Sequence, residues 1–201
     1  ALPAALDVLD RTLDRVAQEY REQLAPAIAR VWQDEIESIR VDLRTWLDRS
    51  VDAQATWEPF AFELAFGLPG GPGLDARSTK EEVVLDGGWR LRGIIDLIER
   101  RREGAALRVT DHKTGVNRTA TGLVVGRGEA LQPVLYALAV ERLFGQPVVE
   151  SRLAYCTRTG EFSERGVPLT EAARRRGLQV IETIDRAIAR ADAHHGTVAR
   201  R

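Results

Sequence analysis

The sequence predicts an α/β protein in which helices accompany a set of short β-strands. Apolar residues recur at helical spacing over residues 1–50, and they alternate along short segments between residues 57 and 113. Helical spacing then returns in the last third of the chain. The 201 residues suit a single domain. We therefore expect residues 1–50 to form an N-terminal helical hairpin within the same domain as residues 51–201.

The first fifty residues are expected to form two helices. Leu6, Leu9 and Leu13 recur at helical spacing in the first, and Pro26 can occupy the first turn of the second. The other faces of the second helix are rich in arginine and glutamate, so we expect them to be solvated. The apolar positions that we expect this helix to turn towards a core are Ile28, Val31, Trp32, Ile36, Ile39, Leu43 and Leu47.

The middle of the chain is expected to form strands. Residues 57–66 alternate and are rich in aromatic side chains, whereas residues 67–73 are a glycine- and proline-rich loop without the Gly-Lys-Ser/Thr ending of a P-loop. Asp86-Gly87-Gly88 predicts a tight hairpin between two short apolar runs. Two more strands are expected over residues 92–100 and 107–113, joined by a two-residue turn at Glu103-Gly104.

The last third of the chain returns to helices. A loop that contains several glycines leads into a helix expected over residues 129–144. Strands are expected over residues 148–156 and 161–168, and a final helix from Thr170 to about Ala193. Thr170 can cap that helix, and Glu171 supplies an acidic first turn.

The composition excludes several kinds of site. The net charge of −1 excludes a globally basic nucleic-acid coat, although a local basic cleft is compatible with it. One cysteine, Cys156, excludes a disulfide framework, a cysteine-rich zinc site and a four-cysteine iron–sulfur cluster built within this chain. We expect Cys156 to be a small buried apolar residue. No segment has the roughly 18–20 apolar residues of a membrane span, so no membrane partner is expected.

The residues that point to chemistry lie between 93 and 115. In an antiparallel hairpin that turns at Glu103-Gly104, Glu99 faces Arg108 and Asp96 faces Asp111. Two carboxylates in that position would be roughly 4.5–5.5 Å apart at their Cβ atoms and would repel each other. A divalent cation bound to both would compensate for the repulsion, and oxygen ligands suit Mg²⁺ or Mn²⁺.

Lys113 adds a cation to the same predicted site. Only Lys80 and Lys113 are lysines among the 29 basic residues. Lys113 lies two residues after Asp111 and so points to the same strand face. Lysine can help to deprotonate a water molecule for phosphodiester hydrolysis, which arginine cannot do because it stays protonated. An ion-pair cluster in a structural α/β domain remains an alternative reading of these residues.

Three further polar residues can belong to this site. Glu63 ends an aromatic strand and can supply a third acidic ligand, although an exposed strand glutamate explains it equally simply. Gln132 and Tyr136 stand four apart and so share one face of the predicted helix. For this pair, the edge of a helix packed on a sheet is the alternative.

Together these residues resemble the PD-(D/E)XK nuclease superfamily, and more narrowly the branch formed by the nuclease domains of RecB, AddB and Cas4-type proteins. The resemblance implies a restriction-endonuclease-like core, with a central mixed sheet flanked by helices. The motifs that carry it are Glu63, Gly93-Ile-Ile-Asp96, Asp111-His-Lys113-Thr-Gly115 and Gln132-x-x-x-Tyr136.

The resemblance also implies a role for each residue. Asp96 and Asp111 would bind Mg²⁺ or Mn²⁺, assisted by Glu63 and the backbone carbonyl of His112. Lys113 would position or activate the attacking water. Gln132 and Tyr136 would orient the DNA and the active-site side chains. The His112 ring is expected to point away from Lys113 and is not counted as catalytic.

Two family features are absent from this sequence. Members of the branch often have a metal-site histidine on an early helix, but the only histidines here are His112, His194 and His195. Either that helix lies upstream in a longer protein, which the absence of methionine favours, or the site works without it. A fragment that lacks the helix can be inactive. The four cysteines of an iron–sulfur cluster are absent as well, so no such cluster is expected.

The expected function is metal-dependent cleavage of DNA, most simply exonucleolytic processing of ends in recombination and repair. The substrate would be single-stranded DNA or duplex ends, with a helicase region upstream or in a partner subunit. Such a protein would work in the cytoplasm, at the nucleoid. The alternative is a nuclease-like domain that binds or guides DNA without cutting it. Candidates for phosphate contacts, which flank the motifs, are Arg90, Arg92, Arg118 and Arg127.

Overall fold

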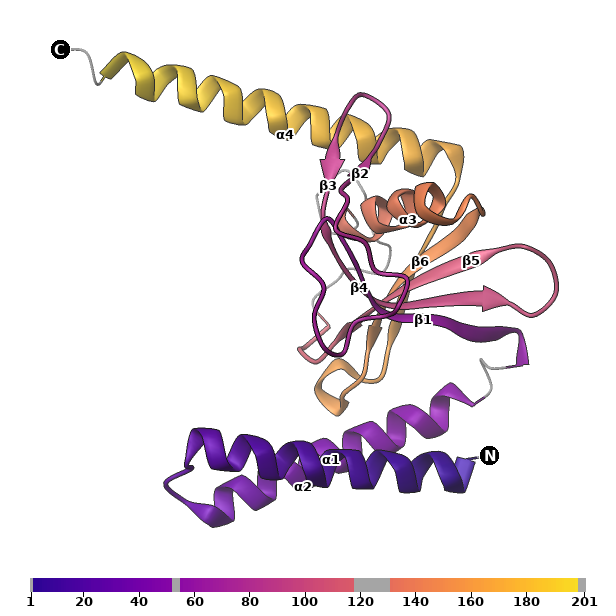
Figure 1. Cartoon of the computed structure of the whole chain (residues 1–201), viewed down its shortest axis with the longest axis vertical. Helices are drawn as coiled ribbons and strands as arrows, with labels where there is room; N and C mark the ends of the chain where they lie inside the picture. The colour runs from indigo at the N-terminus through magenta and orange to yellow at the C-terminus, as the bar shows by residue number, and fades with distance from the viewer. Residues whose placement is uncertain (1, 52–54, 118–130, 199–201) are drawn as a thin grey trace. The chain divides into compact units, whose positions relative to one another are not determined.

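The structure is a computed structural model that describes residues 2–51, 55–117 and 131–198, with side chains described up to residue 190. It confirms the predicted α/β class (Figure 1). The elements in chain order are α1 (Leu2–Leu24), α2 (Ala29–Ser50), β1 (Trp57–Phe66), β2 (Val83–Val84), β3 (Arg90–Leu91), β4 (Gly93–Arg101), β5 (Leu107–Lys113), α3 (Leu131–Phe144), β6 (Val148–Tyr155), the 3-10 turn η3 (Arg158–Gly160), β7 (Glu164–Pro168) and α4 (Glu171–Val198).

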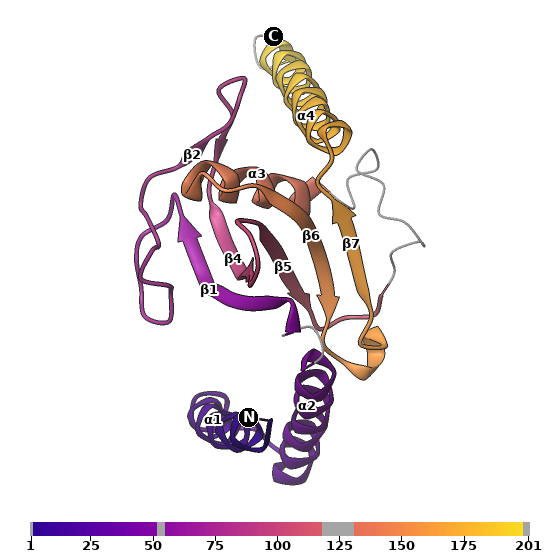
Figure 2. The same ribbon diagram turned by 90° about the vertical axis from the view of Figure 1, so that its right-hand side faces the viewer.

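A mixed five-stranded sheet forms the centre of the fold, with the strand order β1-β4-β5-β6-β7 (Figure 2). The short strands β2 and β3 form a separate two-stranded sheet. A central mixed sheet with flanking helices is consistent with the predicted restriction-endonuclease-like core. Strands β4 and β5, which carry the two predicted metal-binding aspartates, lie next to each other inside the sheet.

Contacts divide the chain into two compact units. The first unit contains Ala1–Glu58, His112–Asn117 and Ala154–Glu164, and the second contains the remaining segments. The first unit therefore joins the helical hairpin to the segment that follows Asp111 along β5. The assignment of residues 1–50 to the same domain as residues 51–201 stays a prediction.

The helical hairpin lacks the core expected of it. Helices α1 and α2 have no buried residue, and Ile28, Val31 and Ile39 are 62%, 53% and 43% exposed, so the expectation that these positions face a core is wrong. Two helices side by side cover only a narrow stripe of each other. Helix α2 also begins at Ala29 instead of near Pro26, because the backbone of Ile28 is extended.

The apolar core lies in the second unit. Helix α3 contributes Val134, Ala137 and Val140, which belong to one buried cluster with strand residues such as Ile98 and Val109. Burial of these side chains contributes on the order of 1.5–3 kcal/mol for each large one. In Figure 2, α3 runs across the sheet. The helix thereby holds the central strands from one side.

The predicted turns and caps are largely confirmed. Val83 pairs with Leu91 in the β2–β3 hairpin, and the positive φ angles of Gly87 and Gly88 supply its tight turn. The loop between β4 and β5 is longer than the expected two-residue turn at Glu103-Gly104. The last hydrogen bond before the loop joins the Arg101 N–H to the Ala106 carbonyl at 2.9 Å, so the loop contains residues 102–105. Thr170 Oγ1 accepts the N–H of Ala173 at 3.2 Å and caps α4 as predicted.

Candidate active site

Strands β4 and β5 pair in the predicted register. Ile98 lies opposite Val109 and Glu99 lies opposite Arg108, and the last pair of the ladder is Leu97 with Thr110. Asp96 and Asp111 are each one residue beyond that pair. The same register therefore favours the predicted position of the two carboxylates next to each other.

Strand β4 is buried on both faces next to Asp96. Ile95, Leu97, Ile98 and Glu99 are all less than 10% exposed, although consecutive residues of a strand point to opposite faces. Asp96 itself is half-buried. The carboxylate therefore lies at the edge of a well-packed part of the sheet.

Asp111 is a buried carboxylate held by helix α3. Its exposed fraction is 7%, and Gln132 Nε2 lies 3.4 Å from its Oδ1. A buried carboxylate needs donors or a cation to offset the loss of hydration. The structure thus brings the predicted metal-binding strand together with the predicted Gln-x-x-x-Tyr helix.

Glu63 lies within electrostatic range of Asp96. Desolvation and the negative charge of Asp96 both raise the pKa of Glu63, although its side chain stays accessible to solvent. Glu63 also has a left-handed backbone with φ of 49° in the middle of β1. Phe62 and Glu63 are consecutive exposed residues, so the strand's alternation breaks there. Glu63 therefore comes from an irregular point on β1, the strand next to β4.

The end of β5 carries His112 and Lys113. The rings of His112 and Trp46 meet edge to face, with their centroids 5.3 Å apart. Residues alternate along a strand, so this contact is consistent with the expectation that the His112 ring points away from Lys113. The Lys113 carbonyl accepts the N–H of Cys156 at 2.9 Å. Cys156 is buried, as expected.

Tyr136 packs over the start of β4. A Cβ atom added to Gly93 would lie 3.0 Å from the Tyr136 hydroxyl oxygen, and the Tyr136 ring also meets Phe66 edge to face. With any other residue there, the Tyr136 ring would have to shift by a few tenths of an ångström. Gly93 is therefore a site residue in its own right, and the close approach explains why a glycine begins the Gly-Ile-Ile-Asp motif.

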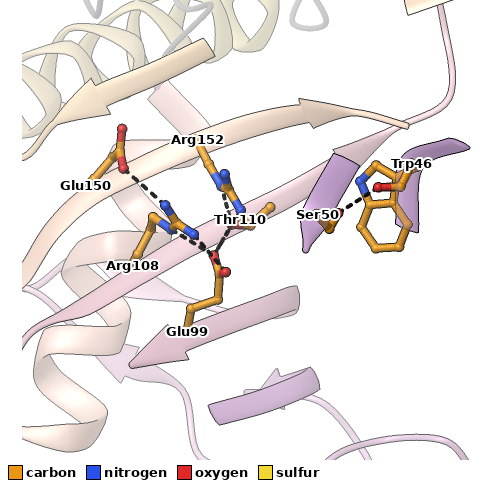
Figure 3. Close-up of polar contacts among 7 residues, drawn as sticks. All are labelled: Trp46, Ser50, Glu99, Arg108, Thr110, Glu150 and Arg152. Carbon is orange, nitrogen blue, oxygen red and sulfur yellow. Dashed lines mark hydrogen bonds and ion pairs between the residues drawn. The ribbon is translucent and has the colours of Figure 1, made fainter. Parts of the chain in front are cut away.

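A buried ion-pair network surrounds Glu99 (Figure 3). It lies on the face of β5 opposite to the face that carries Asp111. Glu99 accepts hydrogen bonds at 2.8 Å from Nε and one terminal nitrogen of Arg108, at 2.9 Å from Thr110 Oγ1 and at 3.1 Å from Arg152. Burial alone would raise the pKa of Glu99, but the two arginines and Thr110 together hold it below its usual value. Since Arg108 and Thr110 alternate with Asp111, the network fixes the strand pair from behind the site.

The four arginines predicted to contact phosphate are only partly described. Arg90 is exposed and forms an ion pair with Glu82 at 2.6 Å. Arg92 is exposed as well. Arg118 and Arg127 lie outside the described residues. The structure therefore leaves the predicted role of all four arginines in DNA binding as a prediction.

The residues at the site fit a hard divalent cation that keeps part of its water shell. Within the described ranges, no three His, Cys, Asp or Glu side chains lie close enough to hold a metal ion by themselves. Mg²⁺ commonly binds to only one or two carboxylates and completes its shell with water and substrate phosphate. Burial and, after it, the negative charge of Asp96 both raise the pKa of Glu63, so the two carboxylates are near enough to repel each other. A cation would offset this charge.

Sequence reasoning missed two contributors to the site's geometry. It named Gly93 in a motif but assigned it no packing role. Asp75, which contacts the backbone of Glu63, and Arg152, which joins Glu99 from β6, are distant in sequence from the residues they contact. No local pattern marks either of them.

Across the part of the chain that the structure describes, no helix is long and apolar enough to cross a membrane.

Comparison with known proteins places the chain in a family. No curated protein matches it. The family model described as the PD-(D/E)XK nuclease superfamily matches residues 1–197. The strand register and the contact between Asp111 and Gln132 agree with that match, and the chain belongs to the PD-(D/E)XK nuclease superfamily.

Proposed function

We propose that this nuclease-family chain is a Mg²⁺- or Mn²⁺-dependent deoxyribonuclease that processes DNA ends. The observation that carries the proposal is the contact between Gln132 and Asp111, at 3.4 Å. Two motifs 21 residues apart meet there, on the strand that also carries Lys113. Membership of the superfamily supports nuclease chemistry in general.

The proposed roles follow the chemistry of each side chain. Asp96 and Asp111, with the His112 carbonyl and with help from Glu63, would hold the cation. When bound, the cation offsets charge on the phosphate and lowers the pKa of water. Lys113 would orient the attacking water and take its proton. Gln132 holds Asp111 in place, and its neighbour Tyr136 would contact the DNA strand.

The proposed setting is a larger recombination and repair protein of the RecB, AddB and Cas4-type branch. In that setting, residues 1–50 and 51–201 act as one domain, and an upstream or partner helicase supplies unwound DNA. Cleavage would be exonucleolytic, in the bacterial cytoplasm. Arg90, Arg92, Arg118 and Arg127 are proposed to contact phosphates.

The test uses three end-labelled or circular DNA substrates with Mn²⁺, with Mg²⁺ and with EDTA. We expect single-stranded and blunt linear DNA to be cut only when metal is present, and a covalently closed circle to survive. Asp111→Asn should abolish cutting. Asp34→Asn is the matched control, because that exposed aspartate on α2 lies far along the chain from the motifs.

Other results would overturn parts of the proposal. Cleavage of the closed circle would replace exonuclease with endonuclease activity. Normal DNA binding without cutting, even with the upstream part of the protein restored, would favour a domain that only guides DNA. Metal-independent cutting, or equal activity in Asp111→Asn, would refute the proposed site.

A further inference from the structure

The left-handed backbone of Glu63 needs a cause. A φ of 49° is unfavourable for a residue with a side chain, because Cβ approaches the following carbonyl oxygen. Such residues persist only where surrounding contacts determine them, and they are concentrated at functional sites. Within β1 (57–66), Glu63 is the one residue with a positive φ, and the strand residues that follow it, 64–66, are all buried.

The segment that follows the glycine-rich loop returns to this point. The Asp75 N–H donates to the Glu63 carbonyl at 3.2 Å. The backbone of Asp75 is therefore tied to the peptide group that follows the left-handed residue. The Asp75 side chain is 12% exposed, so it is partly shielded from water.

Asp75 is itself held in place. Its Oδ1 accepts the N–H of Arg77 at 2.8 Å, and the Arg77 guanidinium lies 3.1 Å from both carboxylate oxygens. Arg77 also donates to the carbonyl of Phe60 at 3.1 Å and stacks over the Phe60 ring at 4.6 Å. Asp75 is thus anchored to β1 on the near side of the bulge.

Further along, the same segment follows the strand more regularly. Ser78 Oγ accepts the Ala65 N–H at 3.0 Å, and the Thr79 N–H donates to the Ala65 carbonyl at 2.9 Å. These bonds hold a part of β1 whose backbone is ordinary. The segment therefore offers a matched pair of contacts, one at the strained residue and one two residues away.

We propose that Asp75 is a positioning residue, which holds Glu63 in its left-handed conformation and so directs the Glu63 carboxylate towards Asp96. This proposal rests on the proposed function, in which Glu63 and Asp96 bind the same cation. A change to alanine keeps the N–H that donates to Glu63 but removes the carboxylate that anchors Asp75 to β1 through Arg77. The bulge can then relax to extended backbone. The relaxed strand would turn the Glu63 side chain away from Asp96.

The first test compares variants of the full chain in Mn²⁺ binding, by calorimetry, and in DNA cleavage. Removal of a group that orients a metal ligand typically costs about 10–100-fold in affinity or activity. We expect Asp75→Ala to show a loss of that size in Mn²⁺ affinity and in kcat. Glu63→Gln should show the same loss. The variant with both substitutions should be no worse than either alone, because both remove the contribution of the Glu63 carboxylate to cation binding.

Two controls separate positioning from simple stability. Ser78→Ala removes a bond from the same segment to the same strand, so it should lower the Tm while leaving Mn²⁺ affinity and kcat near those of the unaltered protein. Asp75→Asn keeps an acceptor oxygen for the Arg77 N–H and should restore most of the loss. An Asp75→Ala protein that binds Mn²⁺ normally, or losses that add in the double variant, would overturn the proposal.

The second test does not depend on nuclease activity. Glycine tolerates a positive φ, so Glu63→Gly should raise the Tm of the protein. In the Asp75→Ala background the bulge can relax, and the same substitution should bring a smaller gain or a loss. An equal gain in both backgrounds would overturn the positioning role.

The two tests distinguish failure of the proposed function from failure of the positioning proposal. A protein that neither binds Mn²⁺ nor cuts DNA, but shows the expected Tm coupling, would refute only the nuclease proposal. If Asp75→Ala does not fold, Glu63→Gly alone still tests the positioning proposal. A Tm of Glu63→Gly below that of the unaltered protein would show that Glu63 is not strained, and would overturn the proposal.

Discussion

Substitution of Glu99 by glutamine tests the network behind the site. The change keeps the shape of the side chain and removes its charge. Arg108 and Arg152, whose side chains are 8% and 9% exposed, then lose the carboxylate that they share. The network lies directly behind the β4–β5 ladder, so its loss should also loosen the strand that carries Asp111.

The expected cost is large for one substitution. Glu99 accepts two hydrogen bonds from Arg108 and one each from Thr110 and Arg152, all at 3.1 Å or less. Breaking a buried ion pair by removing one partner destabilises a protein by about 3–5 kcal/mol. The whole free energy of unfolding of a native domain is commonly only about 5–15 kcal/mol.

Urea unfolding followed by circular dichroism measures this cost. The matched control is Asp7→Asn, which breaks the exposed pair between Asp7 and Arg11 and should cost less than about 1 kcal/mol. A loss below about 1 kcal/mol in Glu99→Gln would show that the two arginines are held without Glu99. That result would refute the reasoning that the network fixes the strand pair.

Three further predictions concern acid stability and aromatic packing. The pKa of Glu99 in the folded protein is held below its usual 4.5. Its contribution to stability is therefore complete above about pH 4.5 and is lost as the pH falls through the pKa of the folded state. Acid titration should show this loss of stability in the native protein and not in Glu99→Gln. Gly93→Ala should cost about 1–3 kcal/mol in urea unfolding because its Cβ would meet Tyr136, and Tyr136→Phe in the same chain should restore part of that loss; equal losses in both would contradict the steric explanation. Trp46→Ala should destabilise the protein by at least about 0.5–1.5 kcal/mol through loss of the ring contact with His112, and an unchanged Tm would argue against that contact.

The strands and their register followed from local patterns. Alternation with period two marked β1 and β5, and the opposite charges of Glu99 and Arg108 selected the pairing that the structure confirms. Helix α3 and the contact of Gln132 with Asp111 followed from helical spacing together with the family resemblance. These features depend on residues that are close in sequence or that belong to one motif.

Other features depend on contacts that no local pattern records. The bulge at Glu63 is associated with Asp75, which reaches it by the return of a long loop. Arg152 joins Glu99 from a strand 53 residues away. On α2, Ile28, Val31 and Ile39 are exposed, whereas the other positions of the expected core face are half-buried. Helical spacing shows that a helix has an apolar stripe, and it does not show how much of that stripe another element covers.

The most direct test of the proposed site compares the only two lysines of the chain. Lys113 follows Asp111 on β5, whereas Lys80 is exposed in the segment that precedes β2. In a Mn²⁺-dependent assay on linear DNA, we expect Lys113→Ala to lower kcat by at least about 100-fold, in the range typical of a lost general base. Lys80→Ala should retain full activity. Equal activity of the two variants would contradict the assignment of Lys113 to catalysis, and with it the proposed active site.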